Sequence, residues 1–64
     1  MKYYIIREDL ATELGLVAYS RGTAERGYLV NNGDLATCDI DREEESGRLT
    51  EVTTSQAKEF IKDL

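Results

Sequence analysis

The run Tyr3-Tyr4-Ile5-Ile6 is the feature of this sequence that most constrains its fold. Such an unbroken run of β-forming residues is too short for a helix of ordinary length, so we predict a strand over residues 2–7. Because side chains alternate along a strand, Tyr3 and Ile5 point to one face of the sheet and Tyr4 and Ile6 to the other. Both faces of this strand are apolar, and the rest of the chain has to cover both.

The chain has only 64 residues with which to do so. Compact domains rarely fall below about 50 residues, so we predict a single domain over residues 1–64 with one core. In so short a chain, hydrophobic burial only just offsets the loss of conformational entropy. The lone cysteine, Cys38, cannot form an intrachain disulfide. Stability therefore has to come from helix caps, tight turns or association with a second chain.

A hairpin is the strongest local prediction in the middle of the chain. Asn32-Gly33 lies between two β-like runs in residues 28–39, and this dipeptide is typical of a two-residue type I′ turn. Pairing outward from the turn places Val30 opposite Leu35. The sequence therefore predicts that these residues form two antiparallel strands.

Shorter segments connect these elements. Residues 16–21 read as a second strand, followed by a polar connection, and residues 48–52 as a short strand before the end of the chain. Residues 9–14 form either a short helical turn or a loop. The acidic run at residues 41–47 is too hydrophilic to be buried and is predicted to be an exposed loop.

The chain ends in a well-signalled helix. Thr53 with Gln56 three residues later makes a capping box, and the residues that follow form one apolar stripe. The stripe comprises Ala57, Phe60, Ile61 and Leu64. We therefore predict an α+β fold: a small, mainly antiparallel sheet of four to five strands with the C-terminal helix packed on one face, and optionally the short turn at residues 9–14.

The residue types argue against catalysis. The chain has no histidine, so no Cys-His or Ser-His pair can form and no side chain is suited to proton transfer near neutral pH. Cys38 is predicted to lie in a strand among apolar residues, where burial makes a thiol inert. We expect no enzyme activity, no cofactor and no small-molecule substrate.

Two spacings resemble known motifs, but each lacks residues that its motif requires. Asp39, Asp41 and Glu43 alternate like the start of a calcium loop, but Glu44 and Thr50 stand where that loop needs glycine and an acid. The glycines at residues 22 and 27 have the spacing of a phosphate-binding loop, but Tyr-Leu follows them in place of the required Lys-Ser or Lys-Thr. We expect neither a metal site nor nucleotide binding.

The charge is uneven along the chain. The net charge is −5, residues 1–32 are neutral, and all of the excess lies in residues 33–64. This balance disfavours nucleic acid and anionic membranes as partners. No run near Met1 resembles a signal peptide or a membrane span, and with a lone cysteine this favours the cytoplasm.

The first functional hypothesis is a protein-interaction module. If a single helix covers one face of the sheet, the opposite face stays exposed and would bind a second copy, giving a homodimer, or another protein. The candidate contact residues are Tyr3, Tyr4, Ile6, Tyr19, Arg21, Arg26 and Tyr28. If residues 8–15 instead fold back as a short helix, they shield that face and the chain is a monomer.

The second hypothesis uses the acidic half of the chain. A regulatory or inhibitory protein would bind a basic, nucleic-acid-handling partner through residues 39–51. The candidate acidic surface comprises Asp39, Asp41, Glu43, Glu44 and Glu45.

Overall fold

A four-stranded antiparallel sheet forms the middle layer of the computed structural model, which describes residues 2–63. The strand order is β2-β3-β1-β4. The strands are β1 (Tyr3–Ile6), β2 (Arg21–Thr23), β3 (Gly27–Asn31) and β4 (Leu49–Val52). The predicted α+β fold with a mainly antiparallel sheet is confirmed.

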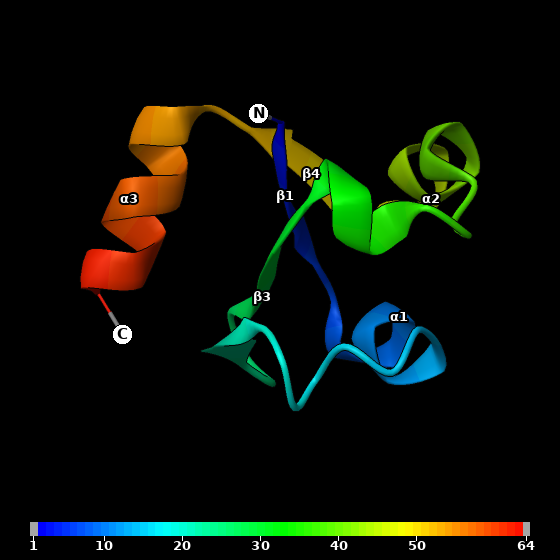
Figure 1. Ribbon diagram of the computed structural model, residues 1–64, viewed down its shortest axis with the longest axis horizontal. Helices are drawn as coiled ribbons and strands as arrows, with labels where there is room; N and C mark the ends of the chain where they lie inside the picture. The colour runs from blue at the N-terminus through cyan, green and yellow to red at the C-terminus, as the bar shows by residue number, and fades with distance from the viewer. Residues whose placement is uncertain (1, 64) are drawn as a thin grey trace.

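Helices lie on both sides of this sheet. The C-terminal helix α3 (Thr54–Lys62) covers one face (Figure 1). On the other side lie α1 (Glu8–Glu13), the 3-10 helix η1 (Asn32–Leu35) and α2 (Ile40–Ser46). The structure therefore has three layers.

The main core lies between the sheet and the layer of α1, η1 and α2. In β1, Tyr4 pairs with Val30, and Ile6 lies between Tyr28 and Leu49. All five side chains point to this face and are at most 6% exposed. The helical layer completes the core with Leu10, Ala11 and Leu35.

The face under α3 is covered less completely. Ala57 and Phe60 of α3 are buried there, but the sheet residues beneath remain half-buried. These are Tyr3, Ile5, Leu29 and Val52. The prediction that both faces of the first strand are apolar is correct. Of the two alternatives for the face opposite the C-terminal helix, exposed or shielded by residues 8–15, the structure shows the shielded one. Residues 8–13 form α1 and, with η1, shield that face.

The hairpin predicted at Asn32-Gly33 is also wrong. A type I′ turn needs positive φ at both residues, and neither has it. Instead, Asn31 Oδ1 accepts a hydrogen bond from the Asp34 N–H, and Asp34 Oδ2 accepts one from the Asn31 N–H, both at 3.1 Å. This local box starts η1 and turns the chain out of the sheet, so that Leu35 enters the core. β3 pairs instead with β2, across a turn at residues 24–26.

Two further segments differ from expectation. Residues 17–19 are a turn, and the strand predicted over 16–21 begins only at Arg21. The predicted acidic loop is the helix α2, which Asp39 caps by accepting a hydrogen bond from the Arg42 N–H and which Gly47 ends at φ +84°. Because α2 has no fully buried residue, it has no apolar stripe by which its helical period could be recognised.

The predicted cap of the last helix is confirmed. Thr53 Oγ1 accepts a hydrogen bond from the Gln56 N–H at 3.1 Å, and Gln56 Oε1 accepts one from the Thr53 N–H at 2.8 Å. Two backbone donors that would otherwise lack intrahelical partners are satisfied in this way.

We expect Thr53→Ala to lower the free energy of unfolding by about 1 kcal/mol, because it removes an N-cap acceptor. Thr54→Ala, one residue along and outside the box, is the matched control and should have a much smaller effect. Urea denaturation of both variants tests this. Equal losses at the two positions would show that the cap contributes nothing specific.

Candidate functional site

Charge is strongly segregated between the layers of the structure. Residues 8–14 and 32–48, which include α1, η1 and α2, contain nine acids and two bases and so carry −7. We call this the acidic layer. The remaining residues contain four acids and six bases and so carry +2. The acids of the acidic layer are Glu8, Asp9, Glu13, Asp34, Asp39, Asp41, Glu43, Glu44 and Glu45.

Most of the predicted acidic surface lies together on α2. Asp39 caps the helix, and Asp41, Glu44 and Glu45 are exposed along it. Glu43 does not belong to this exposed group, because its side chain turns inward and is only 14% exposed. The structure thus divides the predicted acidic residues into an exposed set and one inward carboxylate.

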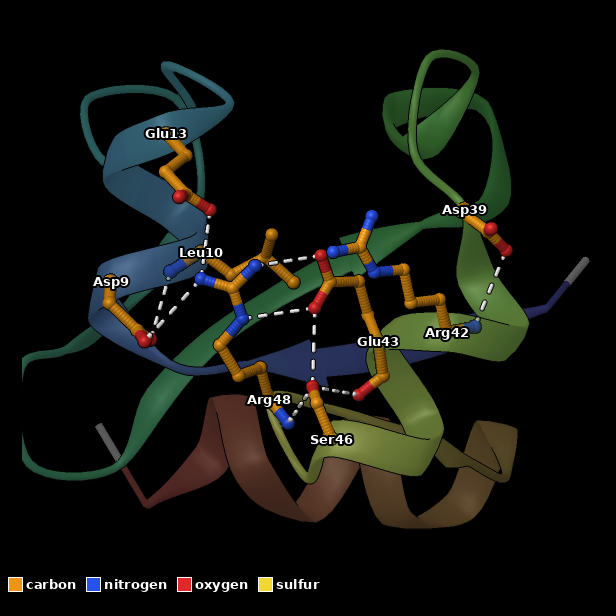
Figure 2. A network of polar contacts seen from close by, with 8 residues as sticks. All are labelled: Asp9, Leu10, Glu13, Asp39, Arg42, Glu43, Ser46 and Arg48. Carbon is orange, nitrogen blue, oxygen red and sulfur yellow. Dashed lines mark hydrogen bonds and ion pairs between the residues drawn. The ribbon is translucent and has the colours of Figure 1, made fainter.

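Arg48 holds that inward carboxylate. It follows Gly47, the residue that ends α2, and its backbone N–H donates a hydrogen bond to the Glu43 carbonyl at 3.1 Å. Its own carbonyl accepts a hydrogen bond from the N–H of Arg7, the N-cap of α1, at 2.9 Å. The backbone of Arg48 is therefore fixed beside the N-terminus of α1 and the C-terminus of α2. Its side chain lies between α1 and α2 (Figure 2).

One guanidinium contacts three carboxylates. The pair with Glu43 is bidentate, with Nε–Oε1 at 2.9 Å and Nη2–Oε2 at 2.7 Å. Arg48 Nη1 lies 2.8 Å from Glu13 Oε2 and 3.5 Å from Asp9 Oδ2, both on α1. The Ser46 hydroxyl adds a hydrogen bond to Glu43 Oε1 at 3.2 Å. A bidentate arginine–carboxylate pair is a strong, directional contact. Through Nη1, the same guanidinium also contacts Glu13 and Asp9 and so links α2 to α1.

These contacts stabilise the charged forms of both partners. The hydrogen bonds from Arg48 hold the pKa of Glu43 below its ordinary value of 4.5. The hydrogen bonds to Glu43 and then to Glu13 raise the pKa of Arg48. Arg48 and Glu43 are therefore both charged at neutral pH.

The predicted contact residues of the sheet are scattered by the fold. Tyr4, Ile6 and Tyr28 are core residues, at most 6% exposed, and are unavailable for contact with a partner. The Arg26 guanidinium lies 4.8 Å from the centre of the Phe60 ring and 3.7 Å from Asp63, so it fastens α3 to the sheet. The other predicted contacts, Tyr3, Tyr19 and Arg21, line one shallow hollow, in which Tyr19 is 87% exposed.

Cys38 lies in the turn that follows η1, and not in the strand that was predicted. It is half-buried and packs against the core. Burial raises the pKa of the Cys38 thiol, and the negative charges of Glu43 and Asp39 raise it further. The thiol therefore stays protonated, which is the unreactive form.

Within residues 2–63, the carboxylates and the thiol form no group of three or more that could hold a metal ion. In the same part of the chain, no helix is long and apolar enough to cross a membrane. A scan against protein-family models and searches of curated proteins and of solved structures find no match to the chain. The residues and their geometry are therefore the basis for any functional assignment.

We expect Cys38 of the folded protein to be alkylated more slowly at mildly alkaline pH than Cys38 of the same protein in concentrated urea. The reason is that burial and nearby acids disfavour the thiolate only in the folded state. Mass spectrometry after a timed exposure to iodoacetamide measures both rates. Faster reaction in the folded state would show that the thiol is activated.

We expect Glu43→Gln to lower the unfolding temperature near neutral pH. Because the pKa of Glu43 is depressed in the folded state, its contribution is present above about 4.5 and is lost as pH falls through the folded value. The difference from the wild type should therefore shrink in acid. Glu44→Gln, at an exposed neighbouring position, is the control and should change little at any pH. Thermal melts across pH that run parallel for Glu43→Gln and the wild type would contradict the assignment.

Proposed function

We propose that the protein is a small, non-enzymatic interaction module that binds a positively charged protein partner through its acidic layer. The observation that carries this proposal is the segregation of charge, with −7 on the acidic layer and +2 on the remainder. A partner with a basic surface fits this layer by charge. Nucleic acid and anionic membranes would be repelled by it.

The exposed acids of α2 border a hollow that adds apolar contact to charge. The hollow has a volume of about 620 Å³. Cys38 and Ile40 line it, and the acids that line it are Asp39, Asp41, Glu44 and Glu51. Lys2 also lines it and pairs with Glu51 at 3.9 Å. A basic side chain has an aliphatic stem as well as a charged head, so a hollow in which Cys38 and Ile40 lie beside carboxylates suits lysine and arginine.

A surface with charge of one sign acts mainly on the rate at which a partner associates. A field of one sign raises the association rate of an oppositely charged partner and excludes partners of the same sign. At physiological ionic strength this attraction reaches only about 8 Å, so acids held together on helices act jointly whereas scattered acids do not. Proteins that handle nucleic acid carry basic surfaces and form one class of candidate partner. The lone cysteine, which cannot form an intrachain disulfide, favours a cytoplasmic location.

A second candidate is a protein contact or self-association through the hollow lined by Tyr3, Tyr19 and Arg21. It is favoured by the 87% exposure of Tyr19, since tyrosine and arginine are enriched at interface hot spots. Apart from Asp34, the residues that line this hollow lie outside the acidic layer, so the two candidates can be separated by substitution.

The test compares two double variants that carry the same change in charge. Glu44→Gln with Glu45→Gln lies in the acidic layer, and Glu25→Gln with Glu59→Gln lies outside it; each changes the net charge from −5 to −3. Proteins retained from a lysate of the native host are compared at about 0.1 M and about 1 M salt. We expect a basic protein to be retained by the wild type and by the Glu25/Glu59 variant, but to be lost in the Glu44/Glu45 variant and at high salt.

Retention that survives the Glu44/Glu45 change and high salt would contradict binding through the acidic layer. If that retention is lost on Tyr19→Ser, the second candidate is supported instead. Equal loss in both double variants would show that only net charge matters and that the acidic layer is no specific surface.

A further inference from the structure

We propose that Arg48 is a positioning residue for the acidic layer: it holds the carboxylates of α1 and α2 in one surface, so that binding of a cationic partner depends on a cation of this protein. This inference rests on the proposed function. It adds the physical condition under which the acids of two separate short helices act as a single binding surface.

The geometry gives Arg48 contacts with both helices at once. Its guanidinium binds Glu43 of α2 bidentately, at 2.7 and 2.9 Å, and Glu13 of α1 at 2.8 Å. The side chains of Arg48 and Glu43 lie between α1 and α2 (Figure 2). Arg48 itself is only 27% exposed, and its backbone hydrogen bonds to Arg7 and Glu43 limit where it can move.

α2 depends on this contact because its own packing is slight. No residue of α2 is fully buried, and Ile40 at its first turn is half-buried against the core. Glu43, one turn further along, is the second attachment of the helix. The exposed acids Asp41, Glu44 and Glu45 are carried on this same helix, so its orientation sets theirs.

Removing the guanidinium would leave the carboxylates of Asp9, Glu13 and Glu43 facing one another without a cation. Like charges repel, and the half-buried Glu43 carboxylate would be left partly desolvated with no cation beside it. Separation of α1 from α2 relieves both costs. The exposed acids would then no longer form one surface.

Two substitutions that change the charge equally should therefore have opposite effects on binding. Arg42→Gln and Arg48→Gln each remove one base from the acidic layer and change the net charge from −5 to −6. Within residues 2–63 Arg42 is in no ion pair, and its charge is only the last of the causes that lower the pKa of Glu43, so its removal mainly strengthens the negative field. Charge alone would make both variants bind a cation more tightly.

The experiment measures the affinity of a fluorescent oligolysine peptide by anisotropy, at an ionic strength of about 0.01 M. We expect Arg42→Gln to bind more tightly than the wild type. We expect Arg48→Gln to bind more weakly by about fivefold or more, the lower end of typical couplings between sites. Tighter binding by both variants would overturn the proposal.

A second variant keeps the test decisive if Arg48→Gln does not fold. Glu43→Gln with Arg48→Gln removes one charge of each sign, so the net charge stays at −5 and no carboxylate is left half-buried. Its fold is checked by the dispersion of its amide NMR spectrum. Weaker binding than that of the wild type is expected, and equal binding would overturn the proposal.

A measurement on the free proteins separates this inference from the proposed function. If the wild type does not bind oligolysine, the proposed function fails, and the positioning role is judged by amide hydrogen exchange. Arg48→Gln, or the double variant in its place, should then exchange faster in α1 and α2 but not in β1 and β3, whereas Arg42→Gln should resemble the wild type. Unchanged exchange in α1 and α2 would overturn the positioning role.

Discussion

The placement of β1 is the constraint on which the rest of the structure depends. This strand is hydrogen-bonded on both edges, to β3 and to β4, and is packed on both faces. A central strand with apolar residues in both directions cannot be satisfied by a two-layer fold, because one face would remain in water. The chain solves this with helices on both sides of a four-stranded sheet. The two sides differ in composition, because nine of the thirteen acids lie in the acidic layer.

The two helical layers attach to the sheet by different means. α3 places Ala57 and Phe60 on the sheet and is held further by Arg26, which contacts both the Phe60 ring and Asp63. The acidic layer buries Leu10, Ala11 and Leu35, but α2 itself adds no fully buried side chain. A helix with so little apolar contact needs polar attachment, and the Arg48–Glu43 pair supplies it. The most acidic part of the chain is thus held by an ion pair in addition to hydrophobic packing.

The features that the sequence reveals are those determined by neighbouring residues. Tyr3–Ile6 forms a strand and Thr53 with Gln56 forms a capping box because each pattern is complete within a few residues. The hairpin at Asn32-Gly33 failed because two local solutions competed, and the box between Asn31 and Asp34 satisfied backbone groups without positive φ. α2 was missed since recognising a helix by period requires a buried stripe.

The candidate site shows the same division between local and long-range information. Composition alone indicates that the acids of residues 39–45 form a charged surface. Composition does not indicate that Glu43 points inward while Glu44 and Glu45 stay exposed, because that depends on the position of Arg48 beyond the end of the helix. It also cannot show that Asp9 and Glu13, more than thirty residues earlier, share the same guanidinium. The long-range partners of Arg48 are determined only by the folded sheet, which brings the N-terminus of α1 next to the C-terminus of α2.

Like charges held on one surface repel one another, and the Arg48 network reduces this repulsion. A cation placed on the outer surface would neutralise the acids that a partner should meet. A cation placed between the helices neutralises the inward carboxylate of Glu43 and its neighbours Asp9 and Glu13 instead. The exposed acids Asp41, Glu44 and Glu45 keep their charge. Because the field that reaches a partner is the sum over exposed charges, the inward position stabilises the layer at little loss of attraction. Arg48 is 27% exposed and Glu43 is 14% exposed, so the stabilising pair lies largely beneath the surface that the proposed function uses.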